Sequence, residues 1–126
     1  MAPAGRRREN PLESQELEIQ NLTRQCNETL ILFILADGDK HGYQLSLEIE
    51  ERSGGLFRFN HGTLYPILHK LEKEGWIRGK WKSEGSKRKR RLYALTGRGR
   101  RHATAQREAW RRFFDVFFRI VREVDR

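Results

Sequence analysis

The sequence predicts a mainly α-helical fold with one small β-hairpin. Apolar residues recur at helical spacing in several segments, whereas the segment after Gly75 alternates in the manner of a strand. Glycines stand where the helical segments stop, and glycine adopts the left-handed backbone of a helix C-terminus without strain. The chain has 126 residues, which suits one domain with an additional helix or arm.

The composition favours a polyanionic partner. Lysine and arginine total 26 against 17 acidic residues, which gives a formal net charge of +9. Duplex DNA, RNA and an anionic membrane surface all agree with this charge. The single cysteine, Cys26, permits no internal disulfide and fits a reducing cytoplasm. The longest apolar run, Leu30–Ala36, is far too short to span a bilayer, so we expect no membrane segment.

The N-terminal third is expected to hold an arm and two helices. Residues 1–11 are polar and contain three consecutive arginines, which indicates a disordered basic arm. Residues 12–23 predict a weak amphipathic helix, with a break at Asn21 before the next helix. The segment Leu22–Ala36 becomes strongly apolar, which is typical of a helix in a core or between subunits. Asp37-Gly38 is expected to end it.

Two short helices follow. The first extends from about residue 42 to residue 53. The second begins after Asn60, a favourable N-cap residue, and ends at Gly75. Because Pro66 lacks an N–H and crowds the preceding turn, we expect a kinked or irregular first turn in this helix. Its apolar stripe, at i, i+3, i+4 and i+7, consists of Leu64, Ile67, Leu68 and Leu71.

A basic hairpin comes next. Residues 76–82 alternate as a strand, residues 83–86 are turn formers, and residues 91–95 return as a second strand. Two short helices followed by such a hairpin form the winged helix-turn-helix arrangement, whose second helix enters the major groove of DNA. Thr96 then caps a last long helix that reaches the C-terminus.

The predicted DNA-binding surface combines the helix after Asn60 with the hairpin. At 100° per residue, the outward face of this helix carries hydrogen-bonding and cationic side chains, with Glu72 at its edge. The basic hairpin extends that face into one cationic surface suited to phosphates. The expected DNA-binding residues are Asn60, His61, Thr63, Tyr65, His69, Lys70, Lys73, Lys87, Arg88, Lys89 and Arg90.

The last helix predicts a homodimer. Its apolar residues form one stripe that water would expose in a monomer, and a self-complementary seam across a two-fold axis would bury it. The stripe contains Trp110, Phe113, Phe114, Phe117, Phe118 and Val121. Packing of the stripe on the first helices of the same chain is the alternative. The chain therefore divides into an arm at 1–11, a winged helix-turn-helix domain with its N-terminal helix at 12–96, and a dimerisation helix at 97–126.

Three strings in a fixed order carry a family resemblance. They are HGY at 41–43, GTLYP at 62–66 and KRRLYALT at 89–96. With the apolar run before Gly38, they resemble the PadR family of winged helix-turn-helix regulators over about residues 25–100. The resemblance implies a cytoplasmic homodimer, usually a repressor, that dimerises through its C-terminal helix. The short C-terminal part is similar to the family's smaller subfamily, in which one long helix follows the wing.

The resemblance also implies an effector site. Many members of the family lose DNA affinity when they bind a small aromatic or hydrophobic molecule. In the smaller subfamily a tryptophan on the last helix can line a cavity at the dimer centre, and Trp110 occupies the matching position relative to Thr96. The alternative is that Trp110 belongs to the dimer core and that phenylalanines fill the space of a ligand. The segment 1–22 is longer and more charged than the shortest N-terminal segments found in the family.

The expected function is therefore sequence-specific binding of double-stranded DNA by a homodimeric transcription repressor, released by a small effector. An effector-independent DNA- or RNA-binding adaptor is the alternative, and a membrane-surface protein is a third reading of the basic aromatic helix. We do not expect an enzyme, because the sequence contains no Gly-rich phosphate loop and no nucleophile beside a plausible base. The four histidines and Cys26 are scattered, so we expect neither a metal site nor a cofactor.

Overall fold

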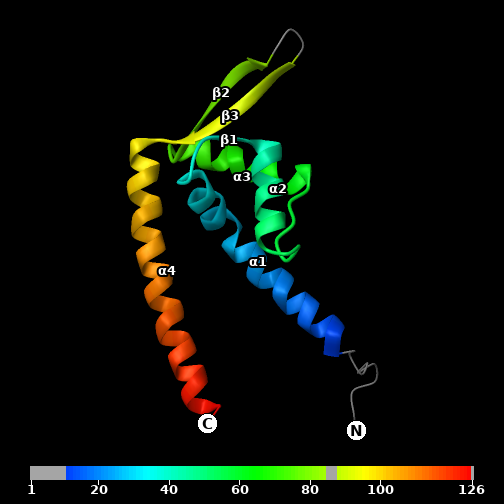
Figure 1. Cartoon of the computed structure of the whole chain (residues 1–126), viewed down its shortest axis with the longest axis vertical. Coiled ribbons are helices and arrows are strands. Elements are labelled where there is room, and N and C mark those ends of the chain that lie inside the picture. Colours follow the sequence, from blue (N-terminus) through cyan, green and yellow to red (C-terminus); the bar gives the residue numbers. More distant parts are fainter. Residues whose placement is uncertain (1–10, 85–87, 126) are drawn as a thin grey trace.

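The structure, a computed structural model, describes residues 11–84 and 88–125. In Figure 1, two long helices project from one side of a small central unit and a β-ribbon projects from the other. This arrangement confirms the predicted fold class, a mainly helical protein with a wing and a long C-terminal helix. The arm expected at 1–11 lies outside the described residues except for Pro11. The elements are α1 (Pro11–Leu35), β1 (Lys40–His41), α2 (Gly42–Arg52), α3 (His61–Lys73), β2 (Ile77–Glu84), β3 (Arg88–Leu95) and α4 (Gly97–Val124).

α1 is one continuous helix of 25 residues, so the predicted break at Asn21 is wrong. Pro11 begins the helix, where its fixed φ and missing N–H are tolerated. A single asparagine lowers helix propensity by only a few tenths of a kcal/mol, which is too little to end a helix. Burial differs along α1: Ile31 is fully buried, whereas Leu17 and Leu22 are more than half exposed.

α2 and α3 form the helix-turn-helix. Gly54 and Gly55, at φ 61° and 86°, allow the chain to turn after α2. α3 begins after Asn60, and its first turn is regular, with the Leu64 N–H donating to the Asn60 carbonyl at 2.9 Å. The helix continues through Pro66 without interruption, so the expected irregular first turn is also wrong. Exposure of Gly62 leaves the carbonyl that Pro66 cannot bond accessible to water.

The core lies where α1, α2 and α3 meet the sheet. Leu35, Leu45 and Leu68 are fully buried in it, one from each of these helices. Three members of the predicted stripe of α3 are buried, and Ile67 packs against them half-buried. Burying a side chain of this size contributes about 1.5–3 kcal/mol, so the stripe holds α3 in place with its opposite face outward.

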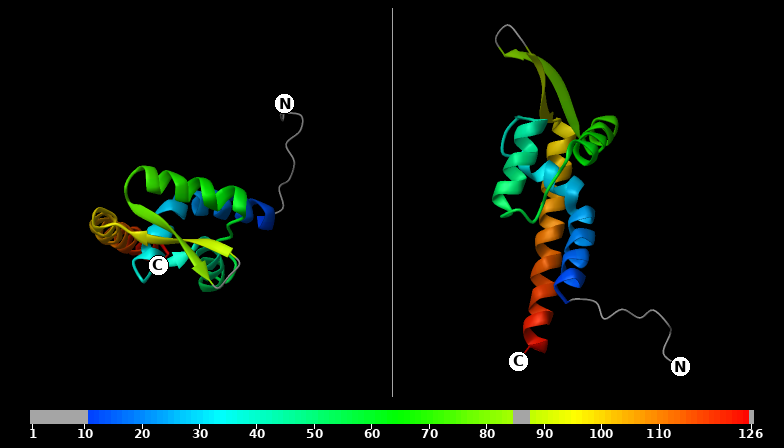
Figure 2. Two further views of the ribbon diagram at one scale, coloured as in Figure 1. Left: turned by 90° about the horizontal axis from the view of Figure 1, so that it is seen from above. Right: turned by 90° about the vertical axis from the view of Figure 1, so that its right-hand side faces the viewer.

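The sheet has the order β1-β3-β2, and all pairing is antiparallel. β2 and β3 form a wing that is longer than predicted, because pairing continues from Ile77↔Leu95 outward to Glu84↔Arg88. β1 is an element that the sequence analysis missed; Lys40 pairs with Tyr93. Figure 2 shows the long curved wing standing away from the helices, while β1 connects its root to the start of α2.

α4 is attached to the central unit through Trp76. The ring of His102 stacks on Trp76 at a centroid distance of 3.9 Å, and the Arg98 guanidinium lies 4.4 Å from the centroid of the same ring. Thr96 accepts a hydrogen bond from the Gly99 N–H at 2.9 Å, which caps the helix. A Cβ atom on Gly99 would overlap the Trp76 carbonyl, so glycine permits this close approach.

Candidate nucleic-acid interface

The outward face of α3 is accessible, because five of the six residues predicted on this helix are exposed: His61, Tyr65, His69, Lys70 and Lys73. The rings of His61 and Tyr65 stack at a centroid distance of 5.6 Å. Tyr65 also covers Gly42, where an added Cβ would lie 3.3 Å from the tyrosine hydroxyl. The first turns of α3 therefore lie against the start of α2, with the Tyr65 ring held between His61 and Gly42.

Asn60 and Thr63 are tied to each other at the helix start. The Asn60 Oδ1 atom accepts hydrogen bonds from the Thr63 N–H at 2.9 Å and from the Thr63 hydroxyl at 3.0 Å. Asn60 is exposed and Thr63 half-buried. Asn60 is thus the N-cap of α3, with its amide nitrogen left to donate to a partner, and the Thr63 hydroxyl, which donates to Asn60, can still accept a hydrogen bond.

Lys70 forms ion pairs that its sequence context did not predict. Its Nζ atom lies 2.6 Å from Glu28 Oε1 on α1 and 4.0 Å from Glu74 Oε1. The hydrogen bond to Glu28 and its negative charge raise the pKa of Lys70. Lys70 therefore links α3 to α1 while its side chain remains 55% exposed, and Lys73 is a second exposed cation of α3.

The wing carries exposed cations on both strands. Lys80 and Lys82 on β2 and Arg90 on β3 are exposed. Lys87 lies outside the described residues, and for the two predicted residues that follow it, Arg88 and Lys89, the structure describes only the backbone pairing in β3. The exposed cations of β2 are thus part of the wing surface, although the predicted set of DNA-binding residues did not include them.

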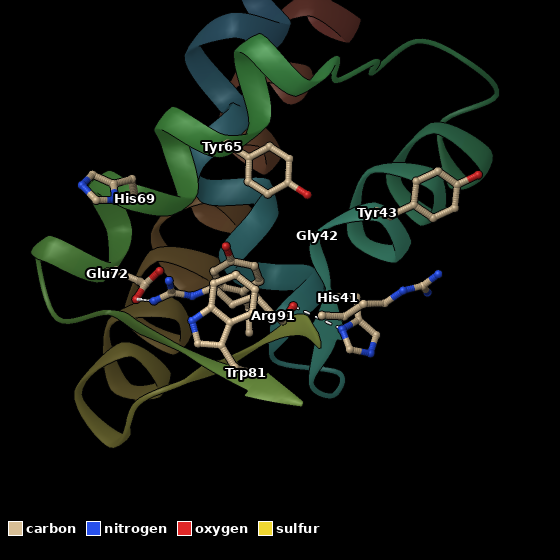
Figure 3. Close-up of a pocket in the computed structure, with 10 residues that line it drawn as sticks. His41, Gly42, Tyr43, Tyr65, His69, Glu72, Trp81 and Arg91 are labelled. Carbon is tan, nitrogen blue, oxygen red and sulfur yellow. Dashed lines mark hydrogen bonds and ion pairs between the residues drawn. The ribbon is translucent and has the colours of Figure 1, made fainter. Parts of the chain in front are cut away.

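A groove of about 710 Å³ separates α3 from the wing. Figure 3 shows its labelled residues approaching from β1, α2, α3 and the two wing strands. Sequence reasoning did not include Tyr43 or Trp81, which are 62% and 63% exposed at this groove. Alternation in β2 places Trp81 on the strand face opposite to Lys80 and Lys82. A tryptophan is seldom this exposed, so it could have been singled out as a candidate binding residue.

The second predicted site lies on α4, away from this groove. Phe113, Phe114, Phe117, Phe118 and Val121 are all exposed. Successive rings contact one another along the helix, with centroids 6.0 Å apart for Phe113 and Phe117 and 6.1 Å apart for Phe114 and Phe118. The stripe is therefore present as predicted, and within this chain most of it packs only on itself.

Trp110 is the member of the stripe that turns toward α1. It is half-buried and lies 5.5 Å from Phe114 by ring centroids. Together they line a cavity of about 510 Å³, whose α1 wall includes Cys26 and Phe33. Burial raises the pKa of the Cys26 thiol, which agrees with the apolar character of this wall.

Two further findings apply to residues 11–84 and 88–125. Their histidine, cysteine, aspartate and glutamate side chains form no group of three or more that could hold a metal ion. Their helices include none that combines the length and the apolar character needed to cross a membrane.

The helix-turn-helix, the three-stranded sheet with its wing and the exposed face of α3 define a winged-helix DNA-binding fold. The sequence model of the Transcriptional regulator PadR-like family matches residues 31–105. The chain belongs to this family, whose members are transcriptional regulators.

Relatives and solved structures agree with this assignment. Transcriptional regulator Rv3488 of Mycobacterium tuberculosis is 37% identical over 79 residues, which cover 63% of this chain and 70% of the relative. The structure of a PadR family transcriptional regulator from Eggerthella lenta is similar with a TM-score of 0.70 and 26% identity, over 87% of this chain and 91% of that one.

The negative transcriptional regulator PadR of Bacillus subtilis is 33% identical over 70 residues, which cover 56% of this chain and 38% of that protein. Its crystal structure in complex with operator DNA is similar with a TM-score of 0.58 and 29% identity. That likeness covers 63% of this chain and 45% of the crystallised one, so this chain spans less than half of that relative.

Proposed function

We propose that the protein is a homodimeric transcription repressor that binds a specific sequence of double-stranded DNA in the cytoplasm. The observation that carries the proposal is the groove between α3 and the wing, which has the exposed hydrogen-bonding groups of Tyr65 and His69 on its α3 wall and the exposed cation Arg90 on its wing wall. A helix in the major groove beside a wing on the backbone needs this combination. The family relative crystallised with operator DNA supports the same use of the fold.

The two walls have separate roles in this proposal. Thr63 and His69 on α3 read base edges. Arg90 at the groove neutralises phosphates, and Lys80 and Lys82 do so from the other face of the wing. A direct base contact contributes about 1–3 kcal/mol of discrimination. Each phosphate contact changes the salt dependence of binding by about 0.9 in slope, without sequence preference.

Selection of binding sites from random duplex DNA tests the first role. We expect a recovered site with two-fold symmetry, and a His69→Ala variant that recovers a site altered at a few positions. Competition with RNA at fixed salt separates the adaptor alternative. Recovery of the same site by the wild type and by His69→Ala would contradict base reading by His69, and preference for RNA would contradict the proposal as a whole.

The exposed stripe of α4 supports the homodimer. The α1 wall of the cavity at Cys26 continues along the same helical face to Leu22 and Ile19, at spacings of four and seven residues. Both of these residues are exposed, as is the stripe from Phe113 onward. A second copy that lays its own α4 against these two faces would bury them together, which is the self-complementary contact of a two-fold axis.

Sedimentation velocity tests the dimer. Phe113→Glu with Phe117→Glu should give a monomer that no longer binds the selected site with dimer affinity. Glu108→Gln, an exposed change one turn earlier, is the control and should remain dimeric. A dimer in the doubly charged variant would show that the seam lies elsewhere.

The cavity beside Trp110 supports a small aromatic or hydrophobic effector. Planar rings stack on indole, and apolar walls with few polar groups accept such molecules. Two recognition helices must lie about 34 Å apart to enter successive major grooves, so a ligand that favours another spacing lowers DNA affinity. Titration with phenolic compounds and aromatic cations should quench tryptophan fluorescence and release DNA, and Trp110→Ala should abolish both responses. Persistence of either response in Trp110→Ala would contradict this site.

A further inference from the structure

Arg91 differs from the other cations of the wing in the direction of its side chain. Its Nη2 atom lies 2.5 Å from Glu72 Oε2 on α3, and the two side chains are only 34% and 22% exposed. Figure 3 shows the guanidinium between the wing and α3, with the dashed bond to Glu72. Arg91 therefore connects the two walls of the groove.

The wing is built to hold Arg91 in this position. Arg91 pairs across the strands with Trp81, and its guanidinium lies 5.6 Å from the centroid of the Trp81 ring and 5.8 Å from that of Tyr93. A Cβ atom on Gly79 would overlap Arg91 Nε, so the side chain crosses the strand over a glycine. Nε is buried there without a hydrogen-bond partner among the described residues.

Glu72 belongs to the face of α3 that is proposed to read DNA. It follows His69 by three residues and Tyr65 by seven, which places all three on one side of the helix. An acidic side chain on a DNA-facing surface repels phosphates unless a cation neutralises it. The Arg91 bridge provides that neutralisation and fixes how far the face of α3 lies from the wing.

We propose that Arg91 is a positioning residue for DNA recognition, which holds the wing at a fixed distance from α3 through Glu72 and makes no phosphate contact of its own. The proposal rests on the proposed function, because the distance matters only if the two walls bind one DNA duplex. The proposal gives Arg91 a different role from Arg90, its exposed neighbour in the same basic run, which contacts phosphate.

The test measures affinity by fluorescence anisotropy for two duplexes, the site selected from random DNA and a shuffled duplex of equal length, at several salt concentrations. Glu72→Gln removes a negative charge, so electrostatics alone predicts tighter binding to both duplexes. If the bridge positions the wing, the ratio of the affinity for the selected duplex to that for the shuffled duplex should fall at least about tenfold in Glu72→Gln, as after loss of a base contact. Glu51→Gln, an exposed change on α2, is the control that leaves the ratio unchanged.

Substitution of the arginines separates positioning from phosphate binding. Arg91→Ala should lower the ratio as Glu72→Gln does, and the double variant should be no worse than either, since both changes remove one bridge. Arg90→Ala should weaken binding to both duplexes alike and reduce the salt slope by about 0.9.

Gly79→Ala is an independent variant that removes no charge. Its methyl group displaces the Arg91 side chain and should reproduce the loss of discrimination, even if Arg91→Ala does not fold. A wild-type affinity ratio in both Glu72→Gln and Gly79→Ala would overturn the positioning role. Failure of the proposed function would look different, because the wild type itself would then bind the selected and shuffled duplexes equally.

Discussion

Replacement of Gly99 by alanine tests how α4 is attached to the DNA-binding unit. The new Cβ atom would lie 2.7 Å from the carbonyl carbon of Trp76, whereas ordinary contacts lie at 3.4–4 Å. The opposing atoms are backbone, so no side-chain rotation relieves the overlap. The first turn of α4 must then move away from Trp76, which loosens the Thr96 cap and the stacking of His102 on Trp76.

The expected change in the free energy of unfolding follows from three contributions. Overpacking of this kind costs about 1–3 kcal/mol. A weakened N-cap costs about 1 kcal/mol, and alanine regains about 1 kcal/mol of helix propensity relative to glycine. The variant should therefore be destabilised by about 2 kcal/mol, which for a chain of this size lowers Tm by roughly 8 °C.

Urea unfolding followed by circular dichroism measures this difference, at one protein concentration because a dimer's apparent stability depends on concentration. Gly97→Ala is a matched control in the same helical turn, where the added Cβ meets only Arg101 Nη1 at 3.7 Å. We expect Gly97→Ala to be as stable as the wild type or slightly more so. Equal stability of the two alanine variants would refute the argument that Gly99 is required by the contact with Trp76.

Three further predictions concern separate parts of the chain. Alanine at both Lys80 and Lys82 should reduce the salt slope of DNA binding by about 1.8, whereas an unchanged slope in anisotropy titrations would remove β2 from the interface. Asn60→Ala should lower the free energy of unfolding in urea by about 1 kcal/mol and Asn60→Asp by much less, and equal losses would argue against the cap. Because burial raises the pKa of Cys26, its thiolate fraction at pH 8 is below that of free cysteine, so iodoacetamide should alkylate it more slowly; an equal rate would contradict its burial.

Periodicity predicted α2 and α3 well because each of these helices buries an apolar stripe in one core. α3 shows this clearly, since the same stripe that identified the helix also fixed its outward face. β1 could not be found in this way, because two residues are too few to show alternation and its pairing partner lies about 50 residues later. The break predicted at Asn21 was wrong because local propensity is weaker than the continuity of a long helix.

The candidate site was predicted as a surface but not as a set of contacts. Sequence reasoning joined the cations of α3 and the wing into one surface, whereas Lys70 binds Glu28, 42 residues away, and Arg91 binds Glu72, 19 residues away. Such pairs depend on tertiary packing and leave no periodic signal. The alternation of β2 assigned Trp81 to one face of the strand. That this face borders the groove could be learned only from the tertiary structure.

The length of α4 also gives the molecule a mechanical property. Its 28 residues span about 42 Å; its first turn packs against Trp76, Ala103 reaches the core, and Trp110 faces α1 across the cavity. Trp110 lies about 20 Å along this rod, so an outward displacement of 1 Å there corresponds to a rotation of about 3° at the joint. The same displacement applied at the far end rotates the joint by less than half as much. α4 is therefore a lever whose response depends on where along it the force is applied, and a wedge at Trp110 turns the DNA-binding unit more than an equal displacement at Val124.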